Sequence, residues 1–147
     1  MNWAPPPPQA PGATHVKIAG IVAIVLTALH ALLMLSVLGN IAFAIVTHTG
    51  FAKVTHARTA FEDGQRVGNA IAFLWTGLTG IVGLVLGPLT AWALLAKRSF
   101  ARRLLWASAI FNLVSCWCFP FGGYFLYVLM RSDVKKELAS YELRRVS

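Results

Sequence analysis

Charged residues are scarce in this sequence, and acidic residues are the scarcest of them. Only 12% of the 147 residues are charged, with 5 Asp and Glu against 13 Lys and Arg, while 57% are hydrophobic. A soluble domain carries roughly 25% charged residues, which cover its water-facing surface. The composition therefore argues against an ordinary soluble domain and indicates a protein whose outer surface faces lipid.

Residues that support catalysis or metal binding are also few. The two cysteines, Cys116 and Cys118, lie in an apolar stretch and point to opposite sides of a helix, so they make no disulfide framework. His48 and His56 have a spacing that matches no familiar zinc motif. We find no nucleophile paired with a base and no phosphate-binding loop. The sequence predicts no catalytic residues, no cofactor and no metal, and hence a protein that is not an enzyme.

The basic residues make the net charge +8. In a soluble protein this excess would suggest nucleic acid, but here the cations stand only beside the apolar runs, which argues against a nucleic-acid partner. This distribution is the one that the positive-inside rule produces. The cations are Lys17, Lys53, Arg58, Arg66, Lys97, Arg98, Arg102, Arg103, Arg131, Lys135, Lys136, Arg144 and Arg145.

Three apolar runs cover residues 18–46, 69–96 and 104–130. A membrane helix needs about 20 such residues, and a cleaved signal sequence has an apolar region of only about 7 to 15. The first two runs therefore predict membrane helices. The preceding residues 1–16 are rich in proline, which favours extended backbone, and we expect them to be disordered.

The third run permits two interpretations. Pro120, Gly122 and Gly123 interrupt it, so residues 104–130 form either one kinked helix or a hairpin of two helices. In the hairpin topology ten Lys and Arg lie inside and three outside. In the single-helix topology five lie inside and eight outside. The positive-inside rule favours the hairpin.

The predicted fold is an all-α integral membrane bundle of four transmembrane helices, or three if residues 104–130 form one kinked helix. Residues 1–16 and 139–147 are expected to be cytoplasmic tails, and the protein is expected in the cell inner membrane with both termini inside. The helices are expected at about 17–47, 68–96, 99–119 and 122–138.

The segment from Lys97 to Lys136 also resembles the C-terminal part of a group of small, uncharacterised bacterial membrane proteins. Their last third has a basic loop, an apolar helix, a Pro-x-Gly turn and a short Tyr-rich helix that ends on an acidic residue, Val and basic residues. The matching residues are Lys97, Arg98, Arg102, Arg103, Phe119 to Gly122, Tyr124, Tyr127 to Met130 and Arg131 to Val134. After Gly122 the chain is shorter than the group's pattern, which implies a last helix about one turn short. The resemblance implies a topology and no activity.

Small residues in the second run predict close helix packing. Gly77, Gly80, Gly83 and Gly87, which we call the glycine stripe, fall on one side of a helix. Without a Cβ they permit another helix to approach closely.

Polar residues inside the runs are the candidate functional positions. His30 stands near the middle of the first run, and an ionisable residue there is a candidate proton relay or a packed, neutral imidazole. The side chains of Asn40 and Asn112 either form hydrogen bonds between helices or line a transport path. The leading hypothesis is a structural or accessory membrane protein that associates with itself or with a membrane-protein partner in the lipid bilayer. The alternative is a small transporter or channel lined by His30, Asn40 and Asn112.

Overall fold

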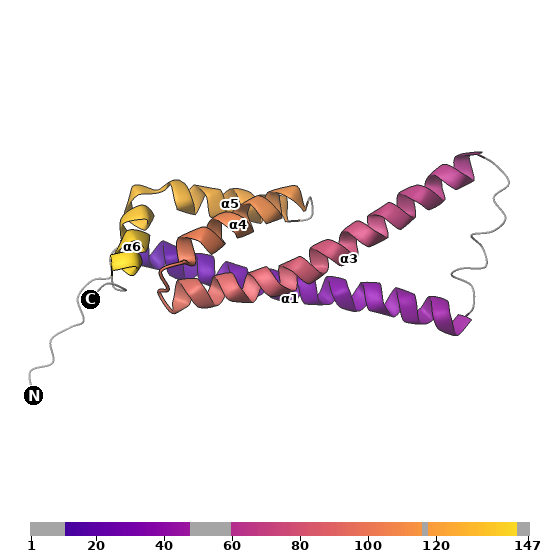
Figure 1. Cartoon of the computed structure of the whole chain (residues 1–147), viewed down its shortest axis with the longest axis horizontal. Helices are drawn as coiled ribbons and strands as arrows, with labels where there is room; N and C mark the ends of the chain where they lie inside the picture. The colour runs from indigo at the N-terminus through magenta and orange to yellow at the C-terminus, as the bar shows by residue number, and fades with distance from the viewer. Residues whose placement is uncertain (1–10, 48–59, 116–117, 144–147) are drawn as a thin grey trace, which may run out of the picture. The chain divides into compact units, whose positions relative to one another are not determined.

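The computed structural model describes residues 11–47, 60–115 and 118–143, and this part of the chain consists of α-helices joined by short turns (Figure 1). The predicted all-α fold is therefore confirmed. The described residues form the helices α1 (Pro11–Thr47), α3 (Ala60–Leu95), α4 (Ala101–Val114), α5 (Phe119–Met130) and α6 (Ser132–Leu143). Residues 1–10, His48, His56 and Cys116 lie outside the described residues.

Two helices, α1 and α3, are long and apolar enough to cross a membrane. The stretches that qualify are Pro11–Phe43 and Val67–Leu95, of 33 and 29 residues. Only 22% and 17% of their most apolar windows are buried, unlike the core helix of a soluble protein. Within the described residues, most of these two windows is therefore not buried by other parts of the protein.

The chain forms two compact units. Unit 1 comprises Met1–Val25 and Leu86–Ser147, and unit 2 comprises Leu26–Val85. Helices α1 and α3 each contribute residues to both units.

Unit 1 has a core to which every helix of the described chain contributes. Residues from α1, α3, α4, α5 and α6 are buried there, and Phe125 is its largest fully buried side chain. The core side chains are Val16, Ala19, Ala23, Ala91, Ala93, Leu94, Ala101, Leu105, Ala109, Cys118, Phe125, Val128, Leu129, Val134, Leu138 and Tyr141.

Helices α4 and α5 form a hairpin within unit 1 and lie side by side (Figure 1). Gly122 allows this approach, since a Cβ at that position would lie 2.7 Å from the backbone nitrogen of Leu113 and 2.9 Å from the carbonyl oxygen of Ala109. Pro120 stands in the first turn of α5, where its missing N–H costs nothing. The segment thus folds back on itself, and the alternative of one kinked helix is wrong for this structure.

Several helix boundaries differ from the prediction. The expected helix over 122–138 is wrong, because α5 ends at Met130, Arg131 is extended (ψ 133°), and α6 begins at Ser132. Residues 139–143, expected in a tail, continue α6. The helix expected over 99–119 is shorter, Ala101–Val114. The helices expected over 17–47 and 68–96 are longer in the structure, because α1 already starts at Pro11 and α3 at Ala60.

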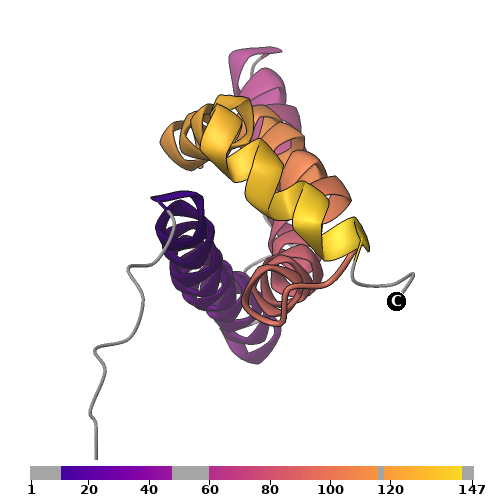
Figure 2. The same cartoon turned by 90° about the vertical axis from the view of Figure 1, so that its left-hand side faces the viewer.

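The start of α1 is ordered because it packs on the protein. A Cβ at Gly12 would lie 2.5 Å from the backbone oxygen of Asp133, so the first turn of α1 contacts the start of α6. Val16, one turn later, is fully buried. Figure 2 views unit 1 from the side of α6 (yellow). This contact explains why residues 11–16 are helical and do not belong to a disordered leader.

Unit 2 pairs the later part of α1 with the earlier part of α3 through two glycines. A Cβ at Gly83 would collide with the imidazole ring of His30, and one at Gly80 would lie 2.5 Å from the sulfur of Met34. No atom lies within 4 Å of the corresponding position at Gly77. Gly80 and Gly83 therefore make the close approach that the glycine stripe predicts, and Gly77 does not. Gly87 belongs to unit 1, where it is half-buried.

Candidate functional site

The candidate functional positions are the polar side chains that the apolar helices bury. In the described residues these are His30, Thr79, Thr90, Ser108, Asn112 and Ser115. Burial of a polar group in an apolar setting is costly unless it is hydrogen-bonded, so the partners of each group indicate what it does.

His30 in unit 2 is a packed residue of α1. Its side chain is 5% exposed, and Nδ1–H donates to the carbonyl oxygen of Leu26 over 2.7 Å. The flat ring lies against the backbone of Gly83, where no side chain intervenes. The imidazole therefore fills the space that the missing glycine side chain leaves, and its Nδ1 is bonded within its own helix.

Asn40 does not share the buried position of His30. Its side chain is exposed, and Nδ2 donates to the carbonyl oxygen of Ser36 over 2.8 Å. Thr79 on α3 is buried, and its hydroxyl likewise donates to the carbonyl of Trp75 over 2.9 Å. The polar side chains of unit 2 thus bond mainly to the backbone one turn earlier, as hydroxyl and amide groups in apolar helices commonly do.

In unit 1, hydroxyl and amide groups tie α3 to α4. The hydroxyls of Thr90 and Ser108 are 2.7 Å apart and form a buried hydrogen bond between the two helices. Asn112 Nδ2 donates to the carbonyl of Ser108 over 2.7 Å, and the Ser115 hydroxyl donates to the carbonyl of Asn112 over 3.3 Å. These α4 residues are spaced four and three apart, so they lie on one buried face.

Among the described residues, two buried polar atoms of the α4–α5 hairpin have no hydrogen-bond partner. They are Oδ1 of Asn112 on α4 and the hydroxyl oxygen of Tyr124 on α5. An unpaired buried polar atom costs on the order of 1–3 kcal/mol. The buried polar groups inside the hairpin are therefore less completely hydrogen-bonded than those at the α3–α4 contact.

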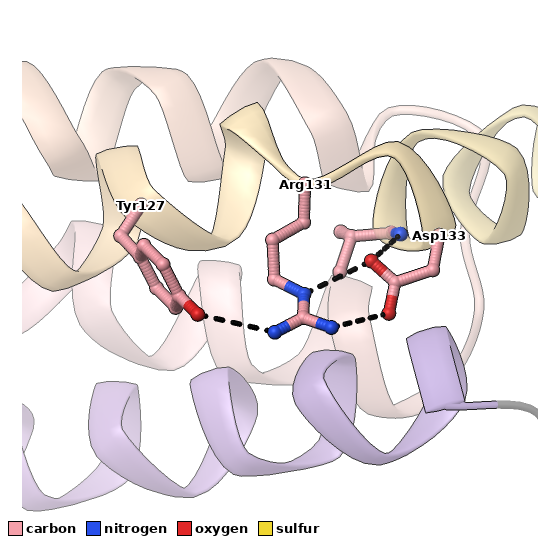
Figure 3. Close-up of polar contacts among 4 residues, drawn as sticks. Tyr127, Arg131 and Asp133 are labelled. Carbon is pink, nitrogen blue, oxygen red and sulfur yellow. Dashed lines mark hydrogen bonds and ion pairs between the residues drawn. The ribbon is translucent and has the colours of Figure 1, made fainter.

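The junction between α5 and α6 holds the ion pair that Figure 3 shows. Arg131 donates from Nε and one terminal nitrogen to the two carboxylate oxygens of Asp133, each over 3.0 Å, and from the other to the Tyr127 hydroxyl over 3.1 Å. Asp133 also accepts from the N–H of Val134. The hydrogen bonds from Arg131 lower the pKa of Asp133. The pair therefore stays ionised and fixes the turn into α6.

Sequence reasoning selected His30 and Asn112, and the structure buries both, but it places them in different units. It missed Thr90 and Ser108, which make the hydrogen bond between helices. The spacing of Ser108, Asn112 and Ser115 was the available signal. Gly20 was missed as well, although Ala19 precedes it and Ala23 follows at a spacing of three residues.

Gly20 makes a close approach in unit 1 similar to that of Gly83 in unit 2. A Cβ there would lie 3.0 Å from the side chain of Leu95. Ala19 and Ala23 on the same helix are fully buried.

The described residues contain no group of three or more His, Cys, Asp or Glu side chains that could hold a metal ion. Comparison of the chain with protein-family models, curated proteins and solved structures finds no match.

Proposed function

We propose that this chain is a small multi-pass protein of the bacterial inner membrane that serves as a structural or accessory component and not as an enzyme. The observation that carries this proposal is the use of the polar side chains within the apolar helices. The hydroxyls of Thr90 and Ser108 hold two helices together, and His30 packs on Gly83. Such contacts are the ordinary means of association between helices in lipid.

The helix lengths support a topology of two spans and a hairpin. The apolar parts of α1 and α3 measure about 50 and 43 Å at 1.5 Å per residue, enough to cross a hydrocarbon core of about 30 Å. Helices α4 and α5 have 14 and 12 residues, or about 21 and 18 Å. We therefore propose that the hairpin enters from the inner side and returns to it without crossing, in place of a third and a fourth span.

The distribution of charge supports an inner location for both termini. Lys17, the cations from Lys97 to Arg103, and those from Arg131 onward then lie on the same side of the membrane. The side that receives more Lys and Arg is the cytoplasmic one. Because a hairpin brings the chain back to the inner side, the number of Lys and Arg on that side is the same whether or not the hairpin crosses the membrane.

The exposed apolar surface supports a role in assembly. Leu32, Leu35 and Phe43 on α1 are 63%, 65% and 68% exposed, and Leu74 on α3 is 71% exposed. Lipid covers such side chains, and so does a second copy of the chain or another membrane protein. The transporter alternative receives less support, because His30 Nδ1 bonds to its own helix and Asn40 lies on an exposed face.

Cysteine accessibility tests the topology. In a background without Cys116 and Cys118, single cysteines replace the exposed Phe119 at the start of α5, Ser99 in the inner turn, or Thr55 in the connector. We expect Thr55→Cys to label from outside, Ser99→Cys from inside only, and Phe119→Cys slowly from either side. Rapid labelling of Phe119→Cys from outside would instead favour four spans.

A separate measurement tests the assembly role. Crosslinking in native membranes, followed by gel separation, should give a discrete band larger than the monomer when the single cysteine replaces the exposed Leu35. The buried Ala19 serves as the matched control site, and Ala19→Cys should give none. A monomer at every position would remove the proposed role in assembly while leaving the topology intact.

A further inference from the structure

Four cations in unit 1 lie together in sequence and have no acidic partner. Lys97 and Arg98 stand in the turn after α3, and Arg102 and Arg103 follow in the first turn of α4. All four side chains are exposed, and within the described part of the chain no carboxylate pairs with any of them. By contrast, Arg131 is paired with Asp133. We call the four residues the basic turn.

The backbone of the basic turn is fixed by hydrogen bonds. The N–H of Arg98 donates to the carbonyl of Ala93 over 2.9 Å, and that of Lys97 to the carbonyl of Leu94 over 3.4 Å. These two bonds form a Schellman motif, with Lys97 at the left-handed position (φ 51°). The turn is therefore a defined structure that holds its cations near one another.

Aromatic side chains surround the basic turn. The guanidinium of Arg98 lies 4.8 Å from the ring centre of Trp92, and the Trp92 and Phe100 rings are 5.8 Å apart. Both rings are partly exposed. Tryptophan at such a position is typical of the level of the lipid headgroups. The ring contact leaves the N–H groups of Arg98 able to donate in the guanidinium plane.

An exposed apolar stripe continues from the basic turn along α4. Trp106, Ile110 and Val114 follow Arg102 at intervals of four residues, and they are 42%, 55% and 57% exposed. Residues at this spacing lie on one side of a helix. One helix face thus presents cations at its start and apolar side chains over the rest of its length.

We propose that the basic turn binds the headgroup of an anionic phospholipid, whose acyl chain lies along Trp106, Ile110 and Val114. Arginine pairs with phosphate through two parallel hydrogen bonds, and among the described residues no carboxylate pairs with Arg102 or Arg103. The apolar stripe distinguishes a lipid from a free phosphate, since a soluble anion leaves those side chains uncovered. The inference rests on the proposed membrane location.

Two basic pairs of equal charge provide the test. One variant carries Arg102→Gln and Arg103→Gln, and the control carries Lys135→Gln and Lys136→Gln on α6, where Glu137 follows. The probe is phosphatidylglycerol, added to purified protein in detergent micelles, with phosphatidylcholine and inorganic phosphate as comparisons. Thermal unfolding gives the apparent affinity.

We expect phosphatidylglycerol to stabilise the unmodified protein and the Lys135/Lys136 control alike. Each cation near an anionic headgroup strengthens binding by roughly fivefold, so the Arg102/Arg103 variant should bind about 25-fold more weakly. The control should change by less than about threefold. If the double variant does not fold, Arg102→Gln alone against Lys135→Gln gives the same comparison, with an expected change of about fivefold.

Equal weakening by both pairs would overturn the proposal, because net charge alone would then explain the effect. Stabilisation by inorganic phosphate at the same concentration would assign the site to a free anion and reject a lipid. Extraction of native membranes with alkaline carbonate separates this failure from that of the proposed function. A protein that stays in the membrane but does not prefer phosphatidylglycerol refutes the lipid site alone.

Discussion

Replacement of single glycines by alanine on α3 should separate packing from helix propensity. Gly77, Gly80 and Gly83 stand three residues apart on the same helix, yet an added methyl group would meet different surroundings at each. At Gly77 it meets open space, at Gly80 the flexible thioether of Met34, and at Gly83 the ring of His30. The expected order of stability is therefore Gly77→Ala, then Gly80→Ala, then Gly83→Ala.

The magnitudes follow from two opposing terms. Alanine in place of glycine stabilises an open helical site by about 0.5–1 kcal/mol. At Gly83 the methyl group displaces an imidazole whose Nδ1 is bonded to Leu26. Overpacking costs about 1–3 kcal/mol, and the lost hydrogen bond costs about another 1 kcal/mol. Gly83→Ala should therefore destabilise the protein by about 1–3 kcal/mol net. Gly80→Ala should destabilise it less, because the Met34 side chain can rotate away from the added methyl group.

Unfolding by sodium dodecyl sulfate in mixed micelles, followed by tryptophan fluorescence, measures these differences. A double-mutant cycle with His30→Ala provides the control, because Gly83→Ala should become nearly harmless once the ring is gone. The coupling free energy should be about 1–3 kcal/mol. Equal effects at Gly77 and Gly83, or a coupling near zero, would refute the contact between His30 and Gly83.

Three further changes test other parts of the chain. Lys97→Gly should stabilise unit 1 by about 1 kcal/mol, since glycine adopts the left-handed conformation without strain; a lower melting temperature would contradict the Schellman turn. Thr90→Val and Ser108→Ala should each destabilise by about 1 kcal/mol with a coupling free energy of about 0.6 kcal/mol, and additive effects would show that the two hydroxyls do not bond. Because Arg131 lowers the pKa of Asp133, the ion pair should stabilise the protein fully above the ordinary value of 3.8, and the stabilisation should be lost as pH falls through the lower folded pKa. The Arg131→Gln variant should lose this step in its melting temperature as pH falls below 3.8, and an unchanged step would assign it to another group.

The sequence was most informative where local chemistry decides the structure. Pro120, Gly122 and Gly123 marked a break in the third run, and the count of Lys and Arg on each side favoured a hairpin over one kinked helix. The length of the first two runs likewise indicated α1 and α3. The all-α class follows from these features without any knowledge of packing.

The sequence was least informative where a distant contact decides. Val134 and Leu138 continue an apolar helical pattern from α5, and this pattern hid the break at Arg131. Ser132 and Asp133 were the available warning, because both residue types favour helix starts. The order of residues 11–16 depends on the contact between Gly12 and Asp133, which no local pattern records.

The candidate site shows the same division. The position of His30 within an apolar run placed it inside an apolar helix, but its burial against Gly83 depends on how two helices align. Asn40 looked equivalent to Asn112 in sequence, yet one is exposed and the other buried. Which face of a long apolar helix meets another helix cannot be read from a run in which almost every residue is apolar.

The division into two units has a consequence for the order in which the protein is made. Unit 2 is a continuous stretch, Leu26–Val85, whereas unit 1 joins Met1–Val25 to Leu86–Ser147. Unit 2 can pair its helices as soon as both have left the ribosome, but the first turn of α1 must wait for its contact with Asp133 at the start of α6. At roughly 5–20 residues per second this wait lasts several seconds. The earliest apolar residues to be synthesised are thus among the last to reach their final neighbours, and a chaperone or insertase that shields them would act during that interval.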